Sequence, residues 1–173
     1  MRPPSDFEAD IARYVLGVLT EQDLPEVATQ ALLEGRSSLA LGALAGEPPS
    51  ASPFLIRELF DRALRDMGMN KPAAEKAVYA LRAFWLHKLA ARDVDAFDTL
   101  GRLLKEVYYP HRSLATRPDE RVVGEALGIA ELVGIYWSIR DGTDEGWLSA
   151  DQRTQLERVA REEAAKCLQT SDG

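Results

Sequence analysis

Residues 121–140 read RVVGEALGIAELVGIYWSIR and form the most apolar stretch of the chain. Apolar residues lie almost all the way round a helix drawn through this stretch, a pattern typical of a helix with neighbours on most sides. We therefore expect a central helix over about residues 119–139. Glu125 and Glu131 lie within it. Because carboxylates are costly in lipid, the stretch is not expected to span a membrane.

The rest of the chain also repeats its apolar residues at helical spacing, and Ala, Leu, Glu and Arg dominate its composition. These residue types favour helix. Capping boxes at residues 5–8 and 149–152 indicate two helix starts. The sequence predicts an all-α, single-domain bundle of about eight helices. Beside the central helix, its members are expected over about residues 6–19, 25–35, 39–45, 53–67, 72–91, 95–109 and 150–168.

Residues 47–53, EPPSASP, have the composition of a linker. They predict a division between a short-helix unit over residues 1–46 and a main bundle over residues 54–173. So short a unit buries too little surface to be expected to fold alone. We therefore expect it to pack on the bundle.

The chain of 173 residues carries 28 acidic and 21 basic residues, a net charge of −7. Residues 1–70 contain 11 acidic and 6 basic side chains, and residues 71–173 contain 17 and 15. Nucleic-acid binding requires clustered Lys and Arg, and no basic stripe is present, so we expect no nucleic-acid partner. An acidic surface favours a basic protein partner. The single cysteine, Cys167, can form no disulfide within the chain, which fits a reducing compartment such as the cytoplasm.

Residues 141–152, DGTDEGWLSADQ, resemble a degenerate calcium-binding EF-hand loop. The resemblance implies Asp141, Thr143 and Glu145 as ligands, but Gln152 replaces the bidentate acid that closes such a loop. The preferred interpretation is a helix end at Gly142 followed by a new helix start. Histidine and cysteine pairs at metal-ligand spacing are absent from the sequence, so we expect no metal or cofactor.

Glu131 lies midway along the apolar stretch, where burial would raise its pKa unless an arginine or lysine pairs with it. Together with His87 and Trp85 it could surround an internal pocket. Such a pocket would suit a small-molecule-binding or hydrolytic protein. The sequence contains neither a nucleophile elbow nor a phosphate loop, so a non-enzymatic role is preferred.

Four short motifs resemble the start of small, uncharacterised all-helical bacterial proteins: YVLG at 14–17, LPEVA at 24–28, ALLEGRSS at 31–38 and LAG at 44–46. The resemblance covers about residues 11–68 and implies no catalytic residues. In size and acidity, some of these proteins are similar to immunity proteins of toxin systems.

The sequence thus predicts a non-enzymatic, acidic helical protein that binds a protein partner, in the manner of an immunity protein or antitoxin. One alternative is the small-molecule or hydrolytic protein with the pocket around Glu131 and His87. The other is a structural homo-oligomer, in which the face of Gly124 and Gly128 or the C-terminal helix packs across a two-fold axis.

Overall fold

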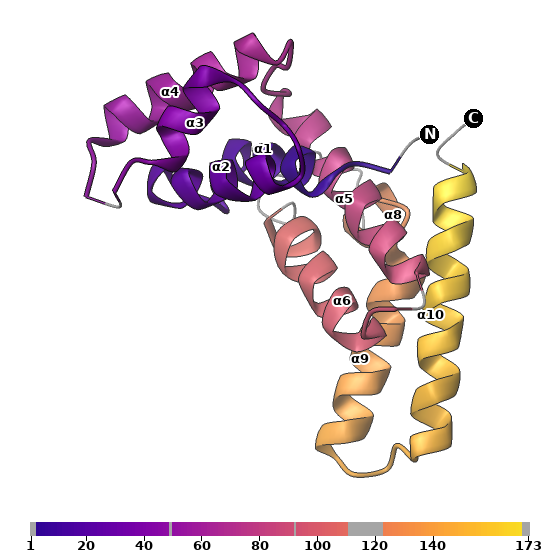
Figure 1. Ribbon diagram of the computed structural model, residues 1–173. Helices are drawn as coiled ribbons and strands as arrows, with labels where there is room; N and C mark the ends of the chain where they lie inside the picture. Colours follow the sequence, from indigo (N-terminus) through magenta and orange to yellow (C-terminus); the bar gives the residue numbers. More distant parts are fainter. Residues whose placement is uncertain (1–2, 49, 92, 111–122, 171–173) are drawn as a thin grey trace. The chain divides into compact units, whose positions relative to one another are not determined.

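The computed structural model describes residues 3–48, 50–91, 93–110 and 123–170. Every regular element in these residues is a helix, which confirms the all-α prediction (Figure 1). Within them, no helix combines the length and the apolar character needed to cross a membrane.

The chain forms two compact units, which divide between Ala80 and Leu81, inside α5 (Ala74–Ala90). We call residues 5–80 the N-terminal unit and the residues from Leu81 onward the C-terminal unit. The sequence pattern placed the boundary at residues 47–53 instead. In the structure, the described residues 47–48 and 50–52 lie between two helices of the N-terminal unit, and Pro53 begins the second of these helices.

The N-terminal unit is built on a core between short helices. Ser5 and Glu8 form the predicted capping box, in which the Glu8 amide donates to Ser5 Oγ at 3.2 Å and the Ser5 amide to Glu8 Oε2 at 2.7 Å. Helix α3 packs on both α2 and α4, and Phe7 and Phe60 are fully buried. The elements before α5 are α1 (Asp6–Val15), the 3-10 turn η1 (Glu21–Asp23), α2 (Leu24–Leu33), α3 (Leu39–Ala45) and α4 (Pro53–Asp66).

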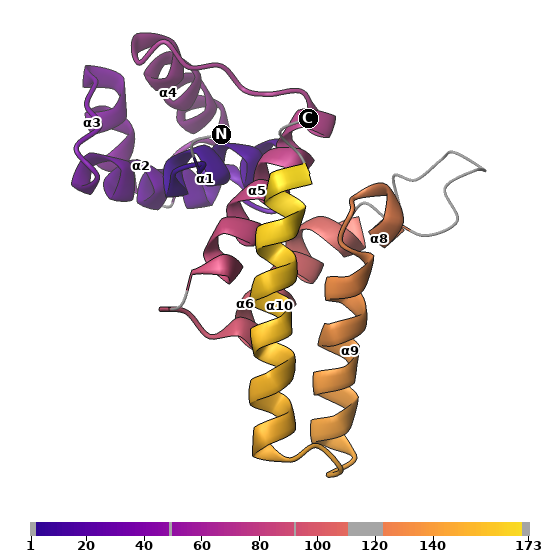
Figure 2. The ribbon, with the colours of Figure 1, turned by 90° about the vertical axis from the view of Figure 1, so that its right-hand side faces the viewer.

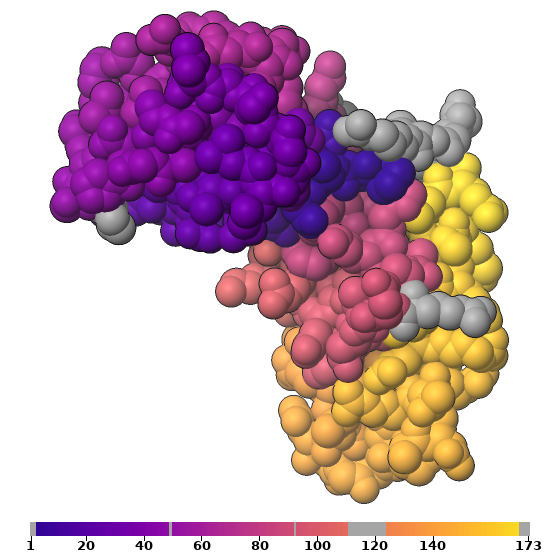
Figure 3. Space-filling view, in the orientation of Figure 1, coloured from indigo at the N-terminus to yellow at the C-terminus, as the bar shows by residue number. Residues whose placement is uncertain are grey.

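The C-terminal unit is centred on an antiparallel hairpin of α9 (Ala130–Asp144) and α10 (Ala150–Thr170) (Figure 2). The two helices pack against each other, and the space-filling view shows their atoms meeting near the turn that joins them (Figure 3). Helix α6 (Ala96–Leu103) packs on both and continues as a π-helical segment, Leu104–Tyr108. The single turn α8 (Val123–Ala126) precedes α9 in the chain.

In place of one continuous helix over residues 119–139, the described part of this stretch contains α8 and α9, separated by a turn at Gly128. Gly128 has a φ of 61°, and its amide donates to the Glu125 carbonyl at 2.9 Å. The next amide, of Ile129, donates to the Gly124 carbonyl at 2.7 Å. These bonds form a Schellman motif, the usual glycine-dependent helix end. Gly128 is thus explained by this helix end, and a Cβ built at Gly124 would lie 3.0 Å from Ala130 Cα, so both glycines have a local explanation.

Two buried side chains, one from α5 and one from α10, form hydrogen bonds with the backbone of this turn. Arg82 of α5 is buried, and its Nε donates to the Leu127 carbonyl at 2.5 Å. Cys167 of α10 donates from Sγ to the Gly128 carbonyl at 3.1 Å. Burial raises the pKa of the Cys167 thiol, so this cysteine stays protonated and suits packing better than nucleophilic chemistry.

Candidate functional site

The three residues predicted to share a pocket have three different surroundings. Trp85 is buried, and its Nε1 donates to Glu106 Oε2 at 2.9 Å. His87 is half-buried and lies two residues after Trp85 in α5. Side chains two residues apart point to opposite sides of a helix. Glu131 is exposed in the first turn of α9, which corrects the expectation that it is buried. The Gly128 turn restarts the helix just before Glu131, so the phase extrapolated from residues 119–127 no longer applies.

The residues compared with a calcium loop do not form one. Asp141 and Thr143 belong to α9, which continues through Gly142 to Asp144. The helix end predicted at Gly142 is therefore wrong, and the glycine with a positive φ, 73°, is Gly146. Thr143 Oγ1 donates to the Ile139 carbonyl at 2.7 Å, and Glu145 Oε2 accepts from Trp147 Nε1 at 2.9 Å. Among the described residues, no three His, Cys, Asp or Glu side chains are placed to share a metal ion. The predicted capping box does form, because the Ser149 amide donates to Gln152 Oε1 and the Gln152 amide to Ser149 Oγ, at 3.0 and 3.3 Å.

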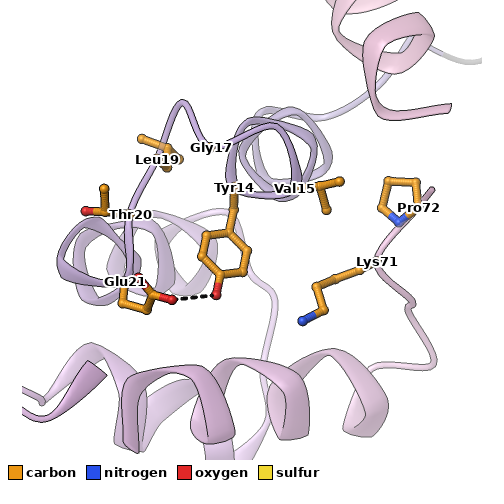
Figure 4. A pocket seen from close by; sticks show the side chains of 8 residues that line it. All are labelled: Tyr14, Val15, Gly17, Leu19, Thr20, Glu21, Lys71 and Pro72. Carbon is orange, nitrogen blue, oxygen red and sulfur yellow. Dashed lines mark hydrogen bonds between the residues drawn. The ribbon is translucent and has the colours of Figure 1, made fainter. Parts of the chain in front are cut away.

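An open pocket of about 550 Å³ lies in the N-terminal unit (Figure 4). Its wall comes from the end of α1, the connection to η1, and two residues that follow α4. Figure 4 shows the ring of Tyr14 between Glu21 on one side and Lys71 on the other. The lining residues are Tyr14, Val15, Gly17, Leu19, Thr20, Glu21, Lys71 and Pro72.

The charged groups around this pocket pair with one another. Glu21 Oε1 accepts from the Tyr14 hydroxyl at 3.3 Å and from Arg57 Nε and Nη2 at 3.1 and 2.5 Å. The hydrogen bond from Arg57 lowers the pKa of the Glu21 carboxyl. Lys71 Nζ lies 2.7 Å from Asp61 Oδ1 and 5.7 Å from the centroid of the Tyr14 ring.

This network is better suited to holding the unit together than to proton transfer. Burial and the nearby charge of Glu21 raise the pKa of Tyr14, so its hydroxyl stays protonated. The network joins α1, η1, α4 and the residue at position 71. The pocket was not predicted from the sequence, because Tyr14 and Lys71 lie far apart in the chain and no local spacing connects them.

A narrow crevice lies in the same unit, where η1 and the start of α2 meet the connection to α4. We call it the proline crevice; its lining residues are Glu21, Gln22, Pro25, Pro48, Ala51, Pro53 and Ile56. Phe54 follows Pro53 in the first turn of α4, and 74% of its surface is exposed. Phe54 is next to Pro53 in the chain but is not among the residues that line the crevice.

The sequence around Phe54 indicates that this side chain is exposed. Helix α4 buries Ile56, Phe60, Ala63 and Leu64, which follow helical spacing. Phe54 lies outside this phase, so an aromatic residue stands on the outer face of an amphipathic helix.

The C-terminal unit has a smaller open hollow of about 320 Å³ between α6 and α9. Phe97 and Tyr136 stack in its wall with centroids 5.2 Å apart, and Asp98, Arg102 and Lys105 also line it. Its charge is mixed, and these aromatic rings pack against each other rather than facing an enclosed space.

In comparisons with known proteins, the chain matches no family model, no curated protein and no solved structure. The resemblance over residues 11–68 therefore stays a prediction.

Proposed function

We propose that this protein is a non-enzymatic, acidic helical module that binds a basic protein partner, in the manner of an immunity protein or antitoxin. The observation that carries the proposal is that surplus negative charge and exposed apolar side chains occur together in the N-terminal unit. Residues 5–80 contain 12 acidic and 7 basic side chains. The three most exposed large apolar side chains of the described chain are in the same unit: Leu39, Leu33 and Phe54, at 92, 77 and 74%.

Both features are typical of a surface that recognises another protein. Covering an exposed apolar side chain with a partner lowers the free energy of the complex. Contacts of this kind supply most of the affinity in protein interfaces. The negative charge adds long-range attraction to a basic partner and repels acidic ones. A reducing compartment such as the cytoplasm fits the single buried cysteine, Cys167.

The test is affinity capture with the full chain from the cells that produce it, at about 50 mM and about 500 mM salt, because added salt screens attraction between charges. We expect one stoichiometric protein with a net positive charge, bound at the lower salt concentration and weakened at the higher one. The captured protein is then purified and the complex rebuilt from the two pure components. Absence of a stoichiometric partner at both salt concentrations, or capture of an acidic partner that is insensitive to salt, would contradict the proposal.

A further inference from the structure

We propose that the basic partner docks at the proline crevice, with Phe54 inserted into an apolar pocket of the partner and with the partner's Lys and Arg side chains facing the carboxylates around the crevice. This inference rests on the proposed function and assigns its contact surface.

The first argument is the position of Phe54. Helix α4 completes its buried face without Phe54, so this side chain contributes little to the core of the unit. Leu55, beside it, is also exposed, at 39%. Pro53 and Ala51 add apolar surface along the crevice. An aromatic residue that protrudes from an apolar surround is the kind of anchor that carries much of the binding energy in protein interfaces.

The second argument is the charge around the crevice. Segments 20–26 and 47–58 meet there, and together they contain one basic residue, Arg57. Arg57 is paired with Glu21, so its charge is offset within the protein. The two segments contain five acidic residues, Glu21, Asp23, Glu26, Glu47 and Glu58, of which Glu21 lines the crevice. This excess favours a basic protein and opposes nucleic acids and anionic lipid surfaces, which are negatively charged.

The other strongly exposed apolar site of the unit lacks this charge. Leu33 and Leu39 flank the segment EGRSS, which contains one acidic residue, Glu34, and one basic residue, Arg36. Arg36 Nε lies 3.7 Å from Glu34 Oε2, so the two charges lie close together. The segment offers apolar surface without charge complementarity to a basic partner. Leu39 is therefore a matched control for Phe54, since both are large, apolar and exposed in the same unit.

The experiment replaces either Phe54 or Leu39 with a photo-crosslinking benzoylphenylalanine in the full chain, expressed in the cells that produce it. Crosslinked proteins are identified by mass spectrometry. We expect a basic protein to crosslink from position 54 and not from position 39. The same basic protein crosslinking only from position 39 would overturn the docking site and leave the proposed function standing. Crosslinking from position 54 to a second copy of this chain, or to an acidic protein, would overturn the inference, as would the absence of any crosslink from both positions.

Substitutions then measure the contribution of each feature to binding of the purified partner. We expect Phe54→Ser to weaken binding at least about tenfold, as is typical of a central aromatic anchor, and Leu39→Ser to change it less than about twofold. Glu58→Lys is expected to weaken binding and its sensitivity to salt, whereas Glu75→Lys, at an exposed position on α5, is not. Because Glu58 is also exposed, this second pair tests the site even if Phe54→Ser alters the fold. Equal effects of the two members of either pair would refute the assignment.

Discussion

Gly142 is the position where an alanine should have the opposite effect from the one that helix propensity predicts. Inside a helix, Gly→Ala ordinarily stabilises by about 0.5–1 kcal/mol, because glycine loses more backbone entropy on folding. Gly142 is buried within α9. A Cβ built there would lie 2.9 Å from Leu148 Cβ and 2.9 Å from Trp147 Cη2.

The contact with Leu148 is the one that cannot relax easily. The ring of Trp147 is more than half exposed and can rotate away. Leu148 Cβ is held by the backbone, since the Leu148 amide donates to the Gly142 carbonyl at 3.0 Å. Overpacking of this kind costs about 1–3 kcal/mol. After the propensity gain is subtracted, Gly142→Ala should lower the free energy of unfolding by about 0–2.5 kcal/mol.

Gly134 supplies the matched control in the same helix. It is exposed, and nothing lies within 4 Å of a Cβ built at this position. Gly134→Ala should therefore raise the free energy of unfolding by about 0.5–1 kcal/mol.

The assay is urea denaturation followed by tryptophan fluorescence and by circular dichroism at 222 nm. The three tryptophans are Trp85, Trp137 and Trp147, so their fluorescence reports on the C-terminal unit. If Gly142→Ala stabilised the unit as much as Gly134→Ala, the packing of the α9–α10 turn would not be tight, and the reasoning would be refuted.

Two further predictions concern a charged pair and a buried arginine. The pKa of Glu21 is lowered in the folded protein by its hydrogen bond with Arg57, so the stabilisation is present above the unfolded-state value of 4.5 and is lost as the pH falls through the folded value. Glu21→Gln should therefore lower the thermal midpoint at neutral pH, and its midpoint should converge with that of the wild type in acid. The control Glu75→Gln should leave the midpoint unchanged. Curves of midpoint against pH that stay parallel for Glu21→Gln and the wild type would argue against the pairing. Arg82→Met leaves the Leu127 carbonyl without the Arg82 Nε donor and should cost about 1–3 kcal/mol, measured by urea denaturation. The exposed Arg158→Met should cost less than about 1 kcal/mol, and equal losses would show that the buried bond does not stabilise the turn.

Local sequence patterns were sufficient for much of the fold. Helical spacing in residues 53–67 predicted α4, and the Ser5–Glu8 and Ser149–Gln152 patterns predicted two helix starts, both of which formed. These predictions succeed because a capping box needs only residues three positions apart, and an amphipathic face repeats every turn.

The expected central helix failed for a reason that local patterns do not reveal. Gly128 is compatible both with a continuous helix and with a Schellman end, and a window of apolar residues does not distinguish them. The turn is held by Arg82 and Cys167, each about 40 residues away along the chain. The burial of Glu131 was predicted from the same helical phase, continued without a break through Gly128. That prediction was wrong for the same reason.

The helical class, the negative charge and several helix boundaries follow from composition and from neighbours within one or two turns. The Tyr14–Glu21–Lys71 pocket, the break at Gly128 and the meeting of segments 20–26 and 47–58 at the proline crevice depend on packing between distant segments. The physical reason is the distance along the chain over which each interaction acts. Hydrogen bonds and apolar spacing within a helix involve residues only a few positions apart. A surface, in contrast, is formed by distant segments that packing of the core brings together.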